Sequence, residues 1–494
     1  MKINQRTLNI TRQFISQFKD KNITLSTLSI LIISFQFIYI FFRSKYLNAE
    51  IPLWYTRLWG DNWLAPKSAI YIIPAVSFLV FVFGLLLILF NRYYIKYFRG
   101  LIWSAVLFCI SFLTYSLITI VHNSSIFFKP AVNPNLIPLF IPLILSFLLT
   151  FLIVPYFIEF AQNKRIVTSP QMHQHPGMVL EAPSARGGGV VYGLIFLLLS
   201  ILFVGIPQHF TGIFLSILMI IGLSIIDDYQ NTHPLSPLKV FENPFLRLFL
   251  LLLSVIPTVL SGILIIEVTN PLGDLLILTS IHKALPAVIT ILWIVWVMNV
   301  LSWSNGIDGQ YSGIIGIASL AVMFLALRFK PLESIHTQIA ILAAISAGSA
   351  FGLSKYNWHP SKIMWGFGAM TAGLLIAALS ISVKGKIITS VLIILIPFMD
   401  AVVTVIRRLI QGKNPLSGDR GHLHHLLLDR GWNVQKIARF YWITTAVFVL
   451  IGLLTPERYA IQTAMIIVGI VAFIIVLMNV RSGLNRKEKL QFER

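Results

Sequence analysis

Two adjacent aspartates, Asp227 and Asp228, follow a long apolar run in the segment IIDDYQN. A carboxylate pair at the end of a membrane span is costly unless cations, protons or hydrogen bonds compensate its charge. Such a pair is suited to holding Mg²⁺ or to acting on a phosphate group. The alternative is the start of a solvated loop, because Asp is common in turns, and the pair alone does not decide between the two.

A second polar segment, NVLSWSNGIDGQYSG, also follows an apolar run. Its polar side chains include Asn299, Asn305 and Asp308, and its glycines are Gly306, Gly309 and Gly313. Glycines let backbone amides approach a ligand closely, and the polar side chains would then line the turn. Taken alone, the segment is better explained as a glycine-rich connector between two spans.

The segment PLSGDRGHLHHLLLDRGW is the most specific of the polar segments. It places His422, His424 and His425 next to Asp419 and Arg420. Imidazole and guanidinium groups are donors that suit a diphosphate, and a neighbouring carboxylate can hold one imidazole tautomer. Histidines also serve transition-metal sites. The alternative is a solvated basic loop, or histidines that lie near lipid headgroups.

Two further features place charge near the apolar runs. In PSARGGGVVYG, Arg186 precedes a glycine triplet that includes Gly188 and opens a span, which suits an anion at a helix N-terminus. Glycines and basic loops are common in membrane proteins, so this segment is weak evidence alone. Asp400 lies within a span, before Arg407 and Arg408. An intramembrane acid is a candidate functional group, and an ion pair with Arg407 is the alternative.

The composition indicates which elements must position these residues. Hydrophobic residues make up 57% of the 494-residue chain and charged residues only 11%, so lipid must be the solvent for most of it. The single cysteine, Cys109, excludes an internal disulfide and a metal site built from cysteines. The net charge of +20 does not indicate nucleic-acid binding, because the basic residues are scattered between apolar runs.

Apolar runs near the ~20 residues needed to cross a bilayer recur along the chain. They predict an all-α polytopic integral membrane protein with about 14 transmembrane helices. The predicted spans are residues 25–42, 69–90, 101–121, 136–158, 188–206, 211–226, 244–266, 285–301, 312–328, 337–353, 363–382, 387–406, 441–455 and 459–480. We divide the chain into an N-terminal module of three spans (1–130), a membrane core (131–482) and a basic cytoplasmic tail (483–494).

The distribution of basic residues predicts the orientation. Most of the 38 Lys and Arg face the cytoplasm if the N-terminus is cytoplasmic, and the C-terminus and all the polar segments then share that side. A transporter would instead gather its ionisable groups near the bilayer midplane on broken helices. The pattern therefore favours an enzyme that acts at the cytoplasmic face. Without an organellar targeting segment, the plasma membrane is the expected location.

Taken together and in this order, the segments resemble those of the polyprenyl-phosphate N-acetylhexosamine-1-phosphate transferases of glycosyltransferase family 4. PSARGGG is similar to the family's PTPRxGG, and Asp227 with Asp228 fall on its aspartate pair. NGIDG resembles its DGxDG turn, and DRGHLHH resembles its histidine motif. The similarity runs from about residue 136 to 480 and implies a transferase-like core of about eleven helices after three extra spans.

The resemblance implies transfer of a sugar-1-phosphate, typically an N-acetylhexosamine, from a UDP-sugar to undecaprenyl or another polyprenyl phosphate, with release of UMP. This reaction would initiate a cell-envelope glycan. Asp227, Asp228 and Asp308 would be catalytic and would hold Mg²⁺. The implied substrate-binding residues are Arg186, Gly188, Asn299, Asn305, Arg420, His422, His424 and His425. The expected partners are the lipid phosphate, the UDP-sugar, the bilayer and a second copy in a homo-oligomer, with no nucleic acid.

The sequence departs from the family pattern at several positions. Thr168 or Ser169 stands where the first loop usually has Asp, and Ser302 and Asn305 replace an expected Asn and Asp. YNWHPSKIMWGFGAM resembles YNxxPAxIFMGDSGS, with Phe367 at the position of a metal-ligating aspartate. Phe cannot coordinate Mg²⁺, which demands oxygen ligands. The alternative is therefore a catalytically silent paralogue that binds a lipid-linked sugar or a partner enzyme.

Overall fold

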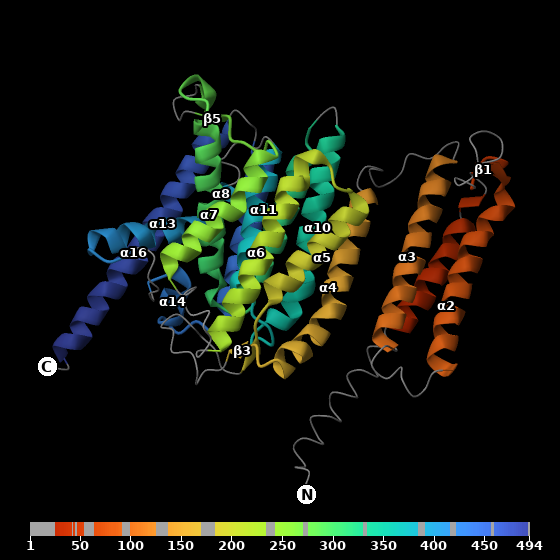
Figure 1. Ribbon diagram of the computed structural model, residues 1–494, viewed down its shortest axis with the longest axis horizontal. Helices are drawn as coiled ribbons and strands as arrows, with labels where there is room; N and C mark the ends of the chain where they lie inside the picture. The colour runs from red at the N-terminus through yellow and green to blue at the C-terminus, as the bar shows by residue number, and fades with distance from the viewer. Residues whose placement is uncertain are drawn as a thin grey trace, which may run out of the picture. The chain divides into compact units, whose positions relative to one another are not determined.

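The computed structural model describes most of the chain as two compact units, Met1–Ile137 and Pro138–Arg494 (Figure 1). The described residues are 25–41, 43–44, 47–53, 64–90, 99–124, 137–168, 183–233, 243–269, 275–329, 333–383, 391–414, 421–455 and 459–492. The division lies close to the boundary predicted at residue 130, and the three predicted domains remain a prediction.

The first unit consists mainly of three apolar helices where three spans were predicted. Its elements are the helix Leu25–Phe41, β1 (Glu50–Pro52), β2 (Leu64–Pro66), the short helix η3 (Lys67–Tyr71), α2 (Ile72–Phe90) and α3 (Arg99–Asn123). β1 and β2 pair antiparallel, and buried Ile40, Ile70 and Leu117 belong to one hydrophobic cluster. Inside this unit, the side-chain amide of Gln36 donates to the Thr114 hydroxyl at 2.7 Å.

The second unit is a helical bundle that carries all the described candidate site residues. Its long helices are α4 (Ile137–Asn163), α5 (Gly188–Phe203), α6 (Gln208–Thr232), α7 (Pro244–Leu260), α8 (Leu285–Trp303), α9 (Gln310–Ala326), α10 (Ser334–Asn357), α11 (Ala369–Ser382), α13 (Leu395–Ile410), α15 (Val434–Leu454) and α16 (Ala460–Phe492). Short elements are β3 (Val167–Thr168), β4 (Ser184–Ala185), β5 (Glu267–Thr269), β6 (Leu275–Ile277), η6 (Leu278–Ser280), η7 (Ser304–Gly306), η8 (Gly366–Gly368) and α14 (Leu423–Leu428). The paired strands form only two-stranded ribbons.

The helices confirm the prediction of an all-α polytopic membrane protein. Among the described residues, eight helices are long and apolar enough to cross a bilayer, and five shorter apolar helices accompany them. The number of fourteen crossings remains a prediction. Helix α16 continues to Phe492, so the segment predicted as a tail from residue 483 begins inside a helix.

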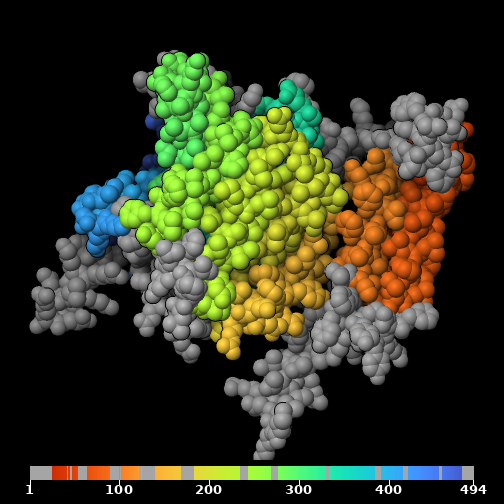
Figure 2. All heavy atoms as spheres, in the orientation of Figure 1, coloured from red at the N-terminus to blue at the C-terminus, as the bar shows by residue number. Residues whose placement is uncertain are grey.

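Burial separates the centre of the second unit from its lipid-facing surface. In the most apolar stretch of 18 residues, 72% of α10 lies buried inside the protein, whereas the corresponding share of α4 is 22%. Large apolar side chains on the outer helices are exposed, among them Leu198, Leu218 and Phe249. Figure 2 shows the face formed by the yellow and green helices α5 to α7. Exposed apolar surface of this kind is what a bilayer solvates.

The connection between α10 and α11, residues 358–368, differs from the prediction that a span begins at residue 363. The backbone of this α10–α11 connector pairs with other segments instead of continuing a helix. The amide of Ala185 donates to the Lys362 carbonyl at 3.1 Å, and the amide of Met364 donates to the Ala185 carbonyl at 2.8 Å. Helix α11 therefore begins only at Ala369.

Candidate active site

The candidate residues gather at one end of the second unit. Figure 1 shows β3 and α14 at the end of the bundle opposite β5. Asp227 and Asp228 lie in the last two turns of α6, Asp308 follows η7, and His424 and His425 lie in α14. The helices carry these polar side chains to the end of the membrane-spanning bundle.

Asp228 is buried and contacts residues from two other segments. Its Oδ1 atom accepts a hydrogen bond from Nε of Arg186 at 2.9 Å and one from the backbone amide of Phe367 at 3.4 Å. A second nitrogen of Arg186 donates to the hydroxyl of Thr168 at 3.3 Å. Oδ2 of Asp228 is buried and has no hydrogen-bond partner in the described part of the chain. This oxygen is a candidate acceptor for a substrate group.

Asp227 forms a separate ion pair, with Arg247 of α7. One Nη atom of Arg247 lies 2.5 Å from Oδ1 of Asp227, and the side-chain amide of Asn231 donates to Oδ2 at 2.7 Å. The Arg247 guanidinium also lies over the ring of Phe367, 5.9 Å from its centroid. Sequence reasoning missed Arg247, although a cation inside an apolar span is itself a signal of function or pairing.

The glycine triplet holds α5 close to the α10–α11 connector. The amide of Gly188 donates to the Met364 carbonyl at 2.9 Å, and that of Gly189 donates to the Trp365 carbonyl at 3.0 Å. These two amides are therefore already used by the backbone, which differs from the expected anion site at the start of α5. A Cβ atom on Gly189 would lie 2.2 Å from the carbonyl carbon of Gly368, so the close approach requires glycine.

The predicted glycine turn forms between α8 and α9. Gly309 adopts a φ of 77°, a backbone conformation that favours glycine, and it precedes the first residue of α9. Oδ2 of Asp308 accepts from the backbone amide of Ser361 at 3.1 Å and lies 2.9 Å from Nδ1 of His359. The α10–α11 connector thus contacts Asp308 near its start and Asp228 near its end. The Asn299 side chain donates to the Val295 carbonyl of its own helix.

The three histidines pack together in a buried cluster. The rings of His422 and His424 are parallel with centroids 5.6 Å apart, and those of His424 and His425 are 4.2 Å apart. A Cβ atom on Gly306 would lie 2.6 Å from Nε2 of His424, so the glycine turn meets the histidines. Burial, followed by the neighbouring His425 and His422, holds the pKa of His424 well below its ordinary value.

Within the described residues, Asp400 is a carboxylate that contacts the histidine cluster. Oδ2 of Asp400 lies 3.0 Å from Nδ1 of His422, and Oδ1 accepts from the backbone amide of Leu423 at 2.7 Å. Arg407, the alternative partner of Asp400, donates to the Gly421 carbonyl at 3.2 Å. Asp419, Arg420 and Ser169 lie outside the described residues.

These contacts form three groups at one end of the bundle: the aspartate pair with its arginines, Asp308 with the connector, and the histidines with Asp400. No set of three or more His, Cys, Asp or Glu side chains within the described ranges is arranged to hold a metal ion. The predicted roles of the individual residues, including Gly188, Asn299 and Asn305, remain predictions.

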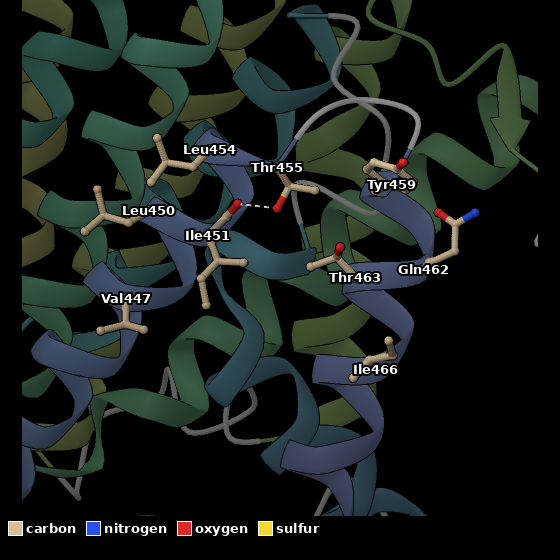
Figure 3. A pocket seen from close by; sticks show the side chains of 9 residues that line it. All are labelled: Val447, Leu450, Ile451, Leu454, Thr455, Tyr459, Gln462, Thr463 and Ile466. Carbon is tan, nitrogen blue, oxygen red and sulfur yellow. Dashed lines mark hydrogen bonds between the residues drawn. The ribbon is translucent and has the colours of Figure 1, made fainter.

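An apolar groove lies apart from these groups, between α15 and α16. Its volume is about 620 Å³, and its lining residues are Val447, Leu450, Ile451, Leu454, Thr455, Tyr459, Gln462, Thr463 and Ile466. Figure 3 shows the aliphatic side chains along both helices and the hydrogen bond from the Thr455 hydroxyl to the Ile451 carbonyl. None of the predicted site residues lines this groove.

Residues 210–384 match the family model described as "Glycosyl transferase family 4". This range includes the aspartate pair, the glycine turn and the α10–α11 connector. It does not include Arg186 or the cluster of His422, His424 and His425. The match therefore covers the centre of the second unit, and the polar segments before and after it lie outside the matched range.

The chain is also similar to curated transferases. It is 27% identical over 212 residues to a decaprenyl-phosphate N-acetylglucosaminephosphotransferase of Mycolicibacterium smegmatis, covering 38% of this chain and 52% of the relative. It is 27% identical over 211 residues to a probable undecaprenyl-phosphate N-acetylglucosaminyl 1-phosphate transferase of Bacillus subtilis, covering 41% and 57%. The chain thus spans little more than half the length of these two relatives.

A third relative matches over a longer stretch. A phospho-N-acetylmuramoyl-pentapeptide-transferase of Nitratiruptor is 29% identical over 335 residues, which cover 61% of this chain and 89% of the relative. The family match and these relatives agree with the segments that carry the resemblance. The chain is thus a member of glycosyl transferase family 4, in the branch that includes polyprenyl-phosphate N-acetylhexosamine-1-phosphate transferases.

Proposed function

We propose that the protein transfers a sugar-1-phosphate, from an N-acetylhexosamine UDP-sugar, to a polyprenyl phosphate such as undecaprenyl phosphate. The observation that carries the proposal is the buried aspartate pair paired with Arg186 and Arg247 at the end of the bundle. A lipid phosphate reaches such a site from the membrane, and a nucleotide-sugar reaches it from water. The names of the relatives, which specify N-acetylglucosamine or N-acetylmuramoyl-pentapeptide transfer, support this substrate class.

In the proposed reaction, an oxygen of the lipid phosphate attacks the β-phosphorus of the UDP-sugar. The bond between that phosphorus and the bridging oxygen breaks, and UMP leaves with the electron pair. Phosphoryl transfer needs mainly positioning and neutralisation of negative charge. Asp228 would orient the attacking phosphate by accepting a hydrogen bond from a protonated phosphate oxygen at Oδ2, and Arg186 would in turn fix Asp228.

The other groups would hold the nucleotide-sugar. His422, His424 and His425, with Arg420, are the proposed contacts for the diphosphate. Asp308, with Asn299, Asn305 and Gly188, is proposed to contact the nucleotide or the sugar. Asp400 would orient His422, because its carboxylate accepts a hydrogen bond from Nδ1–H, so that Nε2–H of the protonated ring could donate to the diphosphate.

The Mg²⁺ ion implied by the resemblance does not fit the described side chains as they lie. Mg²⁺ requires nearly octahedral oxygen coordination. Asp227 and Asp228 each place an oxygen on a guanidinium, and Oδ2 of Asp308 is bonded to the connector. Phe367 offers no oxygen. The assignment of Asp227, Asp228 and Asp308 as metal ligands therefore remains a prediction.

We further propose that the protein resides in the plasma membrane with both termini and the active end cytoplasmic, and that a homo-oligomer forms. The excess of basic residues in the predicted cytoplasmic segments supports this orientation. UDP-sugars are cytosolic substrates, so the polar end of the bundle must face the cytosol to meet them. The alternative of a catalytically silent paralogue is not favoured, because the relatives are transferases by name.

The purified full chain in phospholipid nanodiscs with undecaprenyl phosphate provides the test. We expect release of UMP from UDP-N-acetylglucosamine or a related UDP-sugar. Asp228→Asn should lower the rate by a factor of about 10² or more, because it removes one charge with little change in volume. Glu267→Gln, on β5 at the opposite end of the bundle, is the matched control and should leave the rate unchanged. Rates within about twofold of wild type for Asp228→Asn would contradict the assignment.

A further inference from the structure

We propose that Arg186 and Arg247 supply the positive charge beside the aspartate pair, so that this site operates without a bound divalent cation. The proposal deepens the proposed function, on which it rests, by assigning the source of charge neutralisation. It also predicts a property of the protein, weak affinity for divalent metal, that is measurable without any reaction.

The first observation is the balance of charge around the two aspartates. The side chain of Asp228 is 4% exposed and pairs with Arg186, which is 11% exposed. The side chain of Asp227 is 8% exposed and pairs with Arg247. Removing a carboxylate from water is costly unless a cation compensates it closely. The two guanidinium groups therefore compensate the negative charge of the aspartates, which one divalent ion could otherwise compensate.

The second observation is the surroundings of Phe367. Its backbone amide donates to Asp228, and its ring lies under the guanidinium of Arg247. A cation over an aromatic face is attracted by the ring quadrupole, and the attraction grows when the pair is shielded from water. Because Arg247 contacts both the Asp227 carboxylate and the Phe367 ring, this position favours a guanidinium, and an apolar ring offers nothing to a hydrated Mg²⁺ ion.

The third observation concerns the geometry available to a metal. No cluster of three potential ligands occurs where the chain is described. Oδ1 of Asp228 accepts from both Arg186 and Phe367, so this carboxylate leaves only Oδ2 for a metal unless the guanidinium is displaced. Replacing a paired guanidinium inside a buried site leaves that cation unpaired, which is itself costly.

Arg247 is also suited to meet a phosphate. Its side chain is 32% exposed, far more than that of its partner Asp227, so part of it is accessible from solvent. Guanidinium groups bind phosphate oxygens with parallel hydrogen bonds, and they stay charged at all relevant pH values. In this arrangement Arg247 contacts the transferred phosphate while Asp227 holds it in place, and Arg186 acts as a positioning residue for Asp228.

The test begins with binding of Mn²⁺ alone, a paramagnetic substitute for Mg²⁺, to the purified full chain in nanodiscs. Electron paramagnetic resonance measures the amount of Mn²⁺ bound per protein. We expect no Mn²⁺ site that depends on the aspartates, so Asp227→Asn should leave the amount of bound Mn²⁺ unchanged. The double variant Phe367→Asp, Arg247→Leu restores a carboxylate and removes the competing cation. It should gain a Mn²⁺ site. Stoichiometric Mn²⁺ binding to the wild type, lost in Asp227→Asn, would overturn the proposal.

The second arm measures transfer. Wild-type UMP release should change by less than about twofold between excess EDTA and millimolar Mg²⁺, whereas Arg247→Ala should lose a factor of about 10² in both. Arg247→Lys, which keeps the charge, should retain more activity than Arg247→Ala. Arg328→Ala, at an exposed arginine just beyond the far end of α9, is the control and should behave as wild type. Loss of wild-type transfer in EDTA, restored by Mg²⁺, would contradict the proposal.

The two arms separate this inference from the proposed function. If no transfer occurs under any condition, the proposed function fails, and Mn²⁺ binding still decides the inference. If transfer occurs and needs Mg²⁺, the proposed function stands and the inference is wrong.

Discussion

The imidazole Nδ1 of His422 lies 3.0 Å from Oδ2 of Asp400, although the two residues are 22 positions apart in the chain. Asp400 belongs to α13, and His422 is the N-cap residue of α14. The second oxygen of Asp400 accepts from the amide of Leu423, so both carboxylate oxygens hold the start of α14. The pair fixes the orientation of one histidine in the cluster from inside the bundle.

Asp400→Asn should therefore misorient His422 and lower UMP release by roughly 100-fold, because Asn can donate to Nδ1 and favour the wrong tautomer. The expected change is in the rate, with most of the protein still folded. Thermal unfolding measured alongside the rate checks that point, with Glu267→Gln as the control. Unchanged turnover in a folded Asp400→Asn variant would show that Asp400 does not contribute to the active site.

Gly189→Ala should destabilise the protein by about 1–3 kcal/mol, because the added Cβ would lie 2.2 Å from the carbonyl carbon of Gly368. The amide of Gly189 donates to the Trp365 carbonyl, so the start of α5 cannot move away easily. Gly222→Ala is the matched control: a Cβ there meets no atom within 4 Å, and alanine favours a helix interior. Thermal unfolding in the same detergent should separate the two variants, and equal melting temperatures would show that the contact between α5 and the connector is not tight.

The low pKa of His424 predicts how stability depends on pH. The folded state resists protonation of this buried ring, whereas in the unfolded chain the ring has the ordinary histidine pKa of about 6.5. Between these two values the unfolded state binds more protons, so stability is complete above the unfolded pKa and falls as the pH drops below it. His424→Asn should flatten this dependence between pH 7.5 and 5.5, as followed by melting temperature. An equally steep slope in the variant would assign the effect to other groups.

The proposed orientation predicts which cysteines react from each side. In a Cys109→Ser background, Lys413→Cys should react with an impermeant maleimide only after the cell membrane is permeabilised. Ser280→Cys, at the opposite end of the bundle, should react in intact cells. Both positions are exposed, so access depends on the side of the membrane. The reverse labelling pattern would invert the topology.

Much of the helical framework could be predicted from hydrophobicity, because a bilayer imposes a minimum length on each apolar run. The start of α11 could not, since residues 363–365 are apolar and their role in bonding β4 and α5 depends on distant segments. The candidate residues were found from residue type and order. Their pairing was not: the contact of Asp227 with Arg247 joins two helices, and nothing in a local sequence window specifies it.

A local sequence window also does not show which distant segment the glycine triplet contacts, and this is why an anion site was predicted there. Glycines at the start of a helix indicate a close approach of backbone, but they do not say what approaches. Here the approaching group is the α10–α11 connector, whose carbonyls accept from Gly188 and Gly189.

The proposed reaction moves the sugar together with its phosphate, and the fate of the β-phosphate distinguishes it from transfer of the sugar alone. UDP-N-acetylglucosamine with radioactive phosphorus at the β position is incubated with the full chain and undecaprenyl phosphate in nanodiscs, and the lipid and aqueous fractions are separated. We predict that the label enters the lipid fraction in amounts equal to the UMP released, and that Asp228→Asn abolishes both. Label that remains in water as UDP, while the sugar enters the lipid, would contradict the account.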